Sequence, residues 1–177
     1  MRRLPVGLWS PVSGRHTHPV EHDGNAWVRC DLGHRHWGRY GAAGLLIVDQ
    51  RTGAGGPGPL VLLQHRAAWT ANGDTWGIPG GARDSHESAA EGALREANEE
   101  TGISPADVRI GSELIDDHGS WSYTTVHAEL LAPVTLVPQE ESAELRWVPV
   151  PEVALLDLHP GFALTWPLLR ERLAAPT

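Results

Sequence analysis

Residues 81–103 read GARDSHESAAEGALREANEETGI, and they combine a helical pattern with an unusual concentration of acidic side chains. Glu96, Glu99 and Glu100 fall on one face of an α-helix, because positions i, i+3 and i+4 are neighbours on the helix surface. Three like charges on one face repel one another unless a cation compensates them. The pattern therefore predicts a bound cation beside this helix.

The same segment carries an apolar stripe on a different face of the predicted helix. The stripe follows helical spacing and consists of Ala90, Ala93, Leu94, Ala97 and Thr101. We expect a helix over residues 87–101, with Asp84 and Glu87 resembling a capping box at its start and Gly102 in the left-handed position that ends many helices. Because the apolar stripe can pack on a β-sheet, the acidic face points into a cleft or to water.

Carboxylate oxygens are hard ligands, which suit Mg²⁺ or Mn²⁺. Mg²⁺ in particular keeps several of its waters and takes other ligands from the phosphates of a substrate. A metal-bridged pyrophosphate is thus the ligand that the acidic face favours.

The remaining pattern predicts a single α/β domain preceded by an N-terminal arm. Residues 1–36 are rich in proline and histidine and show no period of 2 or 3.6, so we expect an irregular arm there and one domain over residues 37–177. Residues 42–48 and 60–64 are short apolar runs that flank a glycine and proline loop, and we expect them to pair as strands. Further strands are expected over 108–115, 123–131 and 145–150, with a closing helix over 160–173.

Composition limits the classes of partner. The formal net charge is −8, which argues against binding of long nucleic acid, since such binding relies on clustered lysine and arginine. The single cysteine, Cys30, excludes an intrachain disulfide, and the sequence shows neither a leader peptide nor an apolar run long enough for a membrane span. A cytoplasmic location is therefore expected, with a small anionic substrate if a metal supplies positive charge.

The segment also resembles the Nudix family, because it matches the box Gly-x5-Glu-x7-Arg-Glu-aliphatic-x-Glu-Glu-x-Gly-aliphatic at each fixed position. Residues 76–81 resemble the approach to that box. The resemblance implies an α/β/α sandwich with a mixed β-sheet, in which the box helix covers one face and the C-terminal helix the other. It implies hydrolysis by water attack at phosphorus in a small substrate that contains a nucleoside diphosphate.

The resemblance also implies roles for individual residues. Glu99 and Glu100 would ligate Mg²⁺ (or Mn²⁺) with the Gly80 carbonyl, while Glu96 would act as ligand or general base. An ion pair between Glu87 and Arg95 would orient the carboxylates. A further ligand is expected from the acidic loop before residue 145, with Glu141 as first candidate and Glu144 as second; a solvated loop is the alternative interpretation.

Residues 61–69, 79–87 and 141–147 resemble MutT-type enzymes, which hydrolyse 8-oxo-dGTP to the monophosphate and pyrophosphate, and this is the first assignment. Arg66, Trp121 and Tyr123 are the candidate substrate-binding residues, the two aromatic side chains by stacking on a base or else by packing in the core. The alternatives are an ADP-ribose or nucleotide-sugar pyrophosphatase and a Nudix-fold ligand sensor without turnover. A homodimer is left open.

The arm suggests one further hypothesis. Residues 30–36 contain Cys30, His34 and His36, whose spacing could hold zinc with help from a histidine further upstream. The upstream candidates are His16, His18 and His22. A solvated arm, or a cap over the active site, is the preferred interpretation of this stretch.

Overall fold

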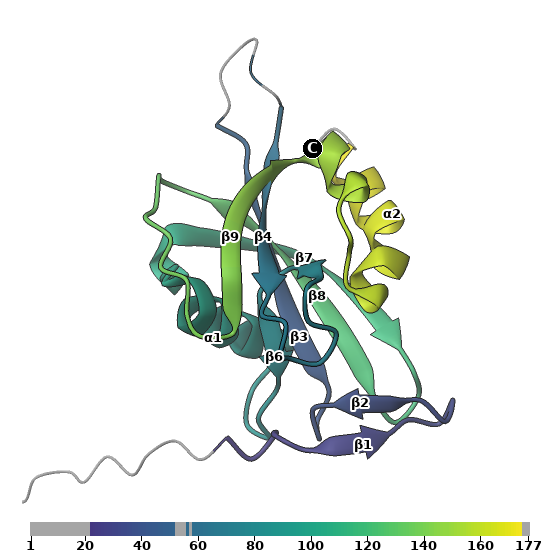
Figure 1. Ribbon diagram of the computed structural model, residues 1–177. Helices are drawn as coiled ribbons and strands as arrows, with labels where there is room; N and C mark the ends of the chain where they lie inside the picture. The colour runs from purple at the N-terminus through teal and green to yellow at the C-terminus, as the bar shows by residue number, and fades with distance from the viewer. Residues whose placement is uncertain (1–21, 52–55, 57, 175–177) are drawn as a thin grey trace, which may run out of the picture.

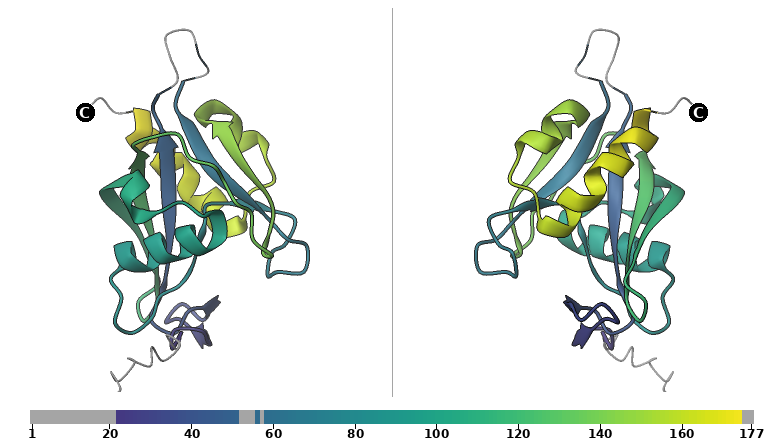
Figure 2. Two further views of the ribbon diagram at one scale, coloured as in Figure 1. Left: turned by 90° about the vertical axis from the view of Figure 1, so that its left-hand side faces the viewer. Right: turned by 90° about the vertical axis from the view of Figure 1, so that its right-hand side faces the viewer.

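A mixed β-sheet lies between two helices in the computed structural model, which describes residues 22–51, 56 and 58–174. The sheet follows the order β5-β4-β3-β8-β7, while β6 pairs with β3 and β9 pairs with β4. Its strands are β3 (Ala42–Asp49), β4 (Leu60–Arg66), β5 (Trp76–Gly77), β6 (Gly80–Ala82), β7 (Val108–Asp117), β8 (Ser122–Leu130) and β9 (Ser142–Pro149). The two side views in Figure 2 show a helix on each side of this sheet, which confirms the predicted α/β/α sandwich.

β3 is the central strand, and it is buried almost throughout. It runs parallel to β8 and antiparallel to β4, so the predicted pairing of residues 42–48 with residues 60–64 is confirmed. Leu45 and Ile47 belong to the core on one face of the sheet, while Leu46 and Val48 belong to the core on the other. Successive side chains of a strand point to opposite faces, which is why a strand covered on both sides is a continuous apolar run.

The helix of the acidic segment, α1 (Ala89–Thr101), begins two residues later than predicted. Its capping box consists of Ser88 and Glu91, and the predicted box of Asp84 and Glu87 is wrong. The Ser88 hydroxyl accepts a hydrogen bond from the Glu91 amide, and the Glu91 carboxylate accepts one from the Ser88 amide at 2.8 Å. These two bonds satisfy amides that a helix start otherwise leaves free, so the helix begins there and Glu87 lies in the preceding loop. Gly102 ends the helix with a φ of 77°, as predicted.

The opposite face of the sheet is covered by α2 (Pro160–Ala174), which packs on it through Phe162, Trp166 and Leu169. Two short 3₁₀ helices, η1 (Pro105–Asp107) and η2 (Val150–Leu155), connect neighbouring elements. Figure 1 shows α1 and α2 on opposite sides of β3. No helix of the described part of the chain is long and apolar enough to span a membrane.

The last part of the N-terminal arm is more regular than expected. The strands β1 (Trp27–Arg29) and β2 (Arg35–Trp37) form an antiparallel hairpin beside one end of the sheet (Figure 1), and Gly33 takes a φ of 82° in its turn. The rings of Trp27 and Trp37 meet edge to face across the two strands, with their centroids 5.5 Å apart. Strands of three residues are too short to produce a period in the sequence, which is why this hairpin was not predicted. Residues 1–21 of the expected arm lie outside the described residues.

Candidate active site

A cleft of about 520 Å³ runs along α1 and is lined by residues from several parts of the fold. The helix contributes Arg95 and the acidic residues, and β6 contributes its glycines. The β1–β2 hairpin contributes Trp27 and Trp37, and the segments that follow β4 and precede β9 complete the wall. The acidic residues of the wall are Glu96, Glu99, Glu100 and Glu141. The lining of the cleft is therefore acidic where α1 contributes to it and aromatic where the hairpin does.

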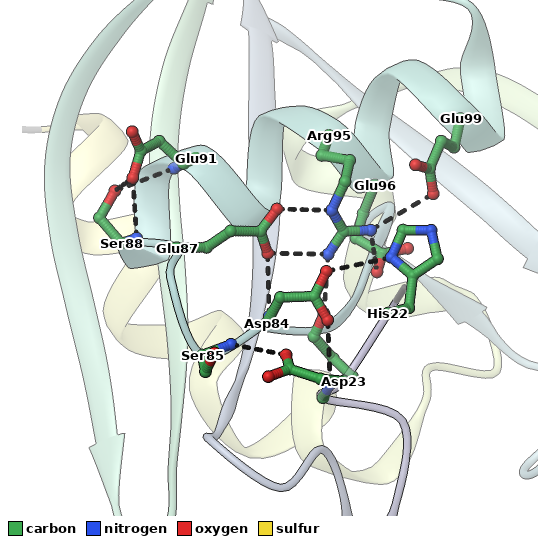
Figure 3. A network of polar contacts seen from close by, with 12 residues as sticks. His22, Asp23, Asp84, Ser85, Glu87, Ser88, Glu91, Arg95, Glu96 and Glu99 are labelled. Carbon is green, nitrogen blue, oxygen red and sulfur yellow. Dashed lines mark hydrogen bonds and ion pairs between the residues drawn. The ribbon is translucent and has the colours of Figure 1, made fainter. Parts of the chain in front are cut away.

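Arg95 connects the acidic residues to the loop before the helix (Figure 3). Its Nε and Nη2 atoms donate to the two carboxylate oxygens of Glu87 at 2.7 and 3.0 Å, which is the expected ion pair. Nη2 also donates to the Ala82 carbonyl at 2.9 Å. Nη1 donates to Glu96 at 2.8 Å and more loosely to Glu99 at 3.3 Å. One guanidinium thus positions two carboxylates of the cleft.

This network keeps Glu87 and Arg95 charged. The hydrogen bonds from Arg95 lower the pKa of Glu87, although partial burial opposes them. The same bonds raise the pKa of Arg95 above its ordinary value. Glu87 also accepts a hydrogen bond from the Asp84 amide at 3.0 Å, so the pair fastens the loop onto the helix.

The glutamates on the cleft side of α1 are crowded and partly desolvated. Burial raises the pKa of Glu96 against the favourable effect of Arg95, and the charge of Glu99 raises it further. Burial and the charge of Glu96 raise the pKa of Glu100 to about 7, while the Gly80 amide donates to its carboxylate at 2.9 Å. A cation would relieve this repulsion, because it favours the ionised form of each carboxylate. The donor set thus suits a hard divalent ion.

Two glycines of β6 allow the cleft to form. A Cβ atom on Gly81 would lie 2.6 Å from the carboxylate carbon of Glu96, and one on Gly80 would lie 2.5 Å from the Ala43 carbonyl oxygen. At Gly80 only glycine lets the backbone of β3 approach β6 this closely, whereas a side chain at Gly81 would displace the Glu96 carboxylate. The glycines of the motif therefore serve the packing around Glu96.

The two candidate metal ligands around the start of β9, Glu141 and Glu144, lie in different surroundings. Glu141 lines the cleft, and its carbonyl accepts a hydrogen bond from the Ala67 amide at 2.9 Å. Glu144 instead receives two hydrogen bonds from Arg146, each at 2.8 Å, and it does not line the cleft. The geometry favours Glu141 of the pair.

The three candidate substrate-binding residues lie in different surroundings, and only one of them lines the cleft. Arg66 lines the cleft. Trp121 does not, because its ring is buried against His36 and its Nε1 donates to the Gly38 carbonyl at 2.9 Å. Tyr123 is also outside the cleft wall, since its hydroxyl lies against Gly44 inside the molecule and burial raises its pKa. Both aromatic residues pack in the interior, which was the alternative for them.

The cleft has aromatic residues that sequence reasoning did not identify. These are Trp27, Trp37 and Trp69, which are 49%, 42% and 69% exposed. His22 also lines the cleft, with its Nδ1 atom 3.1 Å from the buried carboxylate of Asp84 (Figure 3). The only sequence signal for Trp69 was its place in the MutT-like segment after Arg66, and the two hairpin tryptophans gave none.

Comparison with known proteins places this arrangement in a family. The NUDIX domain model matches residues 38–168. The chain is 49% identical over 157 residues to the Mycobacterium tuberculosis protein named "Putative 8-oxo-dGTP diphosphatase 3", in an alignment that covers 85% of this chain and 71% of that protein. It is 42% identical over 171 residues to a nucleoside triphosphate pyrophosphatase/Nudix hydrolase fusion protein of Bifidobacterium longum. That alignment covers 95% of this chain and 34% of the fusion protein.

A solved structure agrees with these sequence relatives. The crystal structure of RenU, a Nudix hydrolase from M. smegmatis, matches with a TM-score of 0.78 and 44% sequence identity. The match covers 87% of this chain and 98% of that one. The chain therefore belongs to the Nudix family and is a hydrolase of phosphoanhydride bonds.

Proposed function

We propose that the protein hydrolyses nucleoside triphosphates, with an oxidised purine nucleotide such as 8-oxo-dGTP as its preferred substrate, and releases the monophosphate and pyrophosphate. The observation that carries the proposal is that one cleft joins an acidic wall on α1 to an aromatic wall on the β1–β2 hairpin. The acidic wall suits a metal-bridged polyphosphate, and the aromatic wall suits the face of a base. The name of the M. tuberculosis relative supports the same substrate class.

The proposed cofactor is Mg²⁺, which Mn²⁺ could replace. Glu96, Glu99, Glu100 and the Gly80 carbonyl would hold it, with Glu141 from the loop before β9; all five residues line the cleft. When bound, such an ion lowers the pKa of a water ligand and neutralises charge that develops on phosphoryl oxygens. The surroundings of Glu100 support this assignment, because burial and the neighbouring charge of Glu96 both raise its pKa, and a bound cation would favour its ionised form.

The chain's own residues would prepare the attack of water. Hydrolysis of the link between the α and β phosphates gives the water oxygen to one phosphorus, and the bridging oxygen leaves with the other phosphate. Glu96 is placed to accept the proton of that water, since Arg95 fixes its carboxylate at 2.8 Å and burial raises its pKa toward the working pH. Arg95 acts as a positioning residue, and Glu87 fixes Arg95.

The aromatic side chains of the cleft would bind the nucleoside. Trp27, Trp37 and Trp69 present exposed rings, and stacking of a base on one aromatic ring contributes about 1–3 kcal/mol. Arg66 supplies a cation on the cleft wall for phosphate oxygens that the metal does not reach. Specificity for a base would arise at this wall.

A substrate panel tests the proposal. 8-oxo-dGTP, dGTP, dCTP, ADP-ribose and nucleotide sugars are assayed with Mg²⁺, and pyrophosphate and phosphate release are measured separately. We expect kcat/KM for 8-oxo-dGTP to exceed that for ADP-ribose by about tenfold or more, which is about 1.4 kcal/mol of differential transition-state binding. Turnover of 8-oxo-dGTP no faster than that of ADP-ribose contradicts the substrate class, and phosphate release without pyrophosphate contradicts the proposed bond.

A further inference from the structure

Outside the cleft, four metal-binding side chains converge from two distant parts of the chain. Cys30, His34 and His36 belong to the β1–β2 hairpin, and His118 lies between β7 and β8. Each offers one ligand atom, and the four atoms lie within 4.8 Å of one another. The Cys30 sulfur is 3.8 Å from Nδ1 of His118 and 3.4 Å from Nε2 of His36.

These separations fit a tetrahedral ion. Zinc lies about 2.3 Å from a thiolate sulfur and about 2.0–2.1 Å from an imidazole nitrogen, so its ligand atoms are about 3.4–3.6 Å apart. Both measured distances from the Cys30 sulfur lie close to that range. The remaining separations among the four atoms are at most 4.8 Å.

We propose that Cys30, His34, His36 and His118 bind a structural zinc ion that joins the hairpin to the end of the sheet. One sulfur and three nitrogen atoms make four ligands, which is the number of ligands and the kind of donor atom found in structural zinc sites. The set differs in chemistry from the oxygen ligands of the cleft, so the two sites select different metals.

The surroundings of the cluster orient its ligands. The Nε2 atom of His118 lies 3.2 Å from a carboxylate oxygen of Asp116, and Nδ1 faces Cys30. A metal-bound histidine usually donates its other ring nitrogen to such a carboxylate, which fixes the tautomer and the ring orientation. The ring of His36 is stacked on Trp121 at 3.8 Å with an interplanar angle of 9°. Two of the three imidazoles are thus held by residues outside the ligand set.

The backbone brings the cysteine and the first histidine together. The Cys30 amide donates to the His34 carbonyl at 3.0 Å, and the Gly33 amide donates to the Cys30 carbonyl at 2.9 Å. The turn therefore closes on itself around the cysteine. Opposite it, a Cβ atom on Gly119 would collide with the Asp31 carboxylate, so the hairpin and the β7–β8 turn touch at this point.

The four side chains of the cluster take no part in the chemistry of the cleft. Cys30 is 6% exposed, too buried for a nucleophile, and none of the four side chains is among the described residues that line the cleft. Of the upstream histidines expected from sequence, His22 contacts Asp84 instead, while His16 and His18 lie outside the described residues. His118 supplies the fourth ligand from 88 positions away.

The hairpin links this site to the cleft. Val28 pairs with His36, and Trp27 pairs with Trp37 at the next position. Because neighbouring residues of a strand point to opposite faces, His36 faces the cluster while Trp37 faces the cleft. A zinc ion would thus hold the aromatic wall in place, and its loss would lower the affinity for substrate. That effect on substrate affinity rests on the proposed function, whereas the zinc site does not.

Metal content tests the site directly. The Glu99→Gln protein, which weakens metal binding in the cleft, is loaded with ZnCl₂, desalted and analysed by elemental mass spectrometry. We expect about one zinc per chain, a drop of about tenfold or more when Cys30→Ser or His118→Ala is added, and no change with His86→Ala. His86 is the control, because it is an exposed histidine that belongs, with Asp84 and Glu87, to the other cluster of potential ligands.

Cobalt gives a readout that does not require a variant of the four cluster residues to fold. In the same Glu99→Gln protein, Co²⁺ should produce the intense visible bands of a tetrahedral ion and a near-ultraviolet thiolate charge-transfer band. Absence of the thiolate band overturns the proposal. Zinc retained by the folded His118→Ala protein, or zinc content no higher in the parent than in Cys30→Ser, overturns it as well. Neither measurement uses substrate, so a failed substrate panel leaves the result unaffected.

Discussion

The guanidinium of Arg95 and the carboxylate of Glu87 form a two-point contact, with hydrogen bonds of 2.7 and 3.0 Å, across the junction between the loop after β6 and α1. Glu87 lies before the helix and Arg95 near its middle, so the pair fixes the approach of the loop. It also leaves the remaining nitrogen of Arg95 free to hold Glu96 and Glu99. A charge pair that is largely hidden from solvent thus sets the geometry of the acidic wall.

Arg95→Lys tests whether the two-point contact matters beyond charge. Lysine is a point charge and cannot reproduce the planar fork, so Glu87 and Glu96 lose their common partner. We expect a loss of about 1–2 kcal/mol in the free energy of unfolding by urea, less than for a fully buried pair because Arg95 is partly exposed. The same variant should lose about tenfold or more in kcat/KM. Unchanged stability and activity would show that charge alone suffices.

Glu87 should make stability depend on pH. The pKa of Glu87 in the folded protein is below the ordinary value of 4.5. Its contribution to the free energy of unfolding is therefore fully present above pH 4.5 and is lost as the pH falls through the folded pKa. Glu87→Gln should therefore reduce the free energy of unfolding at pH 7, and the difference from the parent should vanish in acid. Urea titrations between pH 3 and pH 7 measure this, with Glu171→Gln on the exposed surface of α2 as control. A difference that stays constant with pH contradicts the account.

Gly81→Ala probes the close approach of β6 to the helix. The added Cβ atom would lie 2.6 Å from the carboxylate carbon of Glu96 and displace it. We expect kcat/KM to fall by about tenfold or more, because small misplacements of a reacting group are costly. Gly161→Ala is the matched control, since its Cβ atom would meet only the His159 ring at ordinary contact distance. Equal activity in the two variants would remove Gly81 from the explanation.

The aromatic wall should affect substrate binding more than turnover. Trp37→Ala removes a ring from the cleft, and loss of a stacking surface costs about 1–3 kcal/mol, or roughly 5- to 150-fold in affinity. We expect KM for the nucleotide to rise with kcat little changed. Leu155→Ala removes an apolar side chain that is 82% exposed and does not line the cleft, so it should leave both constants unchanged. A Trp37→Ala protein with unaltered KM contradicts the proposed base site.

Local patterns predicted much of this fold, and distant contacts account for what they missed. The apolar run of β3 and the acidic face of α1 are readable because each depends on residues close in sequence. The start of α1 was misplaced because Asp84 with Glu87 and Ser88 with Glu91 both have the spacing of a capping box. The Asp84 carboxylate instead contacts His22 and accepts a hydrogen bond from the Gly24 amide, which are distant in sequence.

The aromatic residues also show the limit of local sequence patterns. Trp121 and Trp37 look equivalent in sequence, yet the first is buried on His36 and the second lines the cleft. Which tryptophan faces substrate depends on where the hairpin packs, and that is a tertiary contact. Cys30 and His118 likewise meet only in the folded chain.

The most direct test of the central claim compares two glutamates of one helix. Glu99 lines the cleft, whereas Glu91 is exposed and caps the helix, a role that glutamine can also fill. Rates of pyrophosphate release are measured against Mg²⁺ concentration for Glu99→Gln and Glu91→Gln. We predict that Glu99→Gln loses about 100-fold or more in kcat/KM and needs more Mg²⁺, while Glu91→Gln stays within about twofold of the parent. Full Mg²⁺-dependent activity in Glu99→Gln would contradict the claim that the glutamates of α1 hold the catalytic metal.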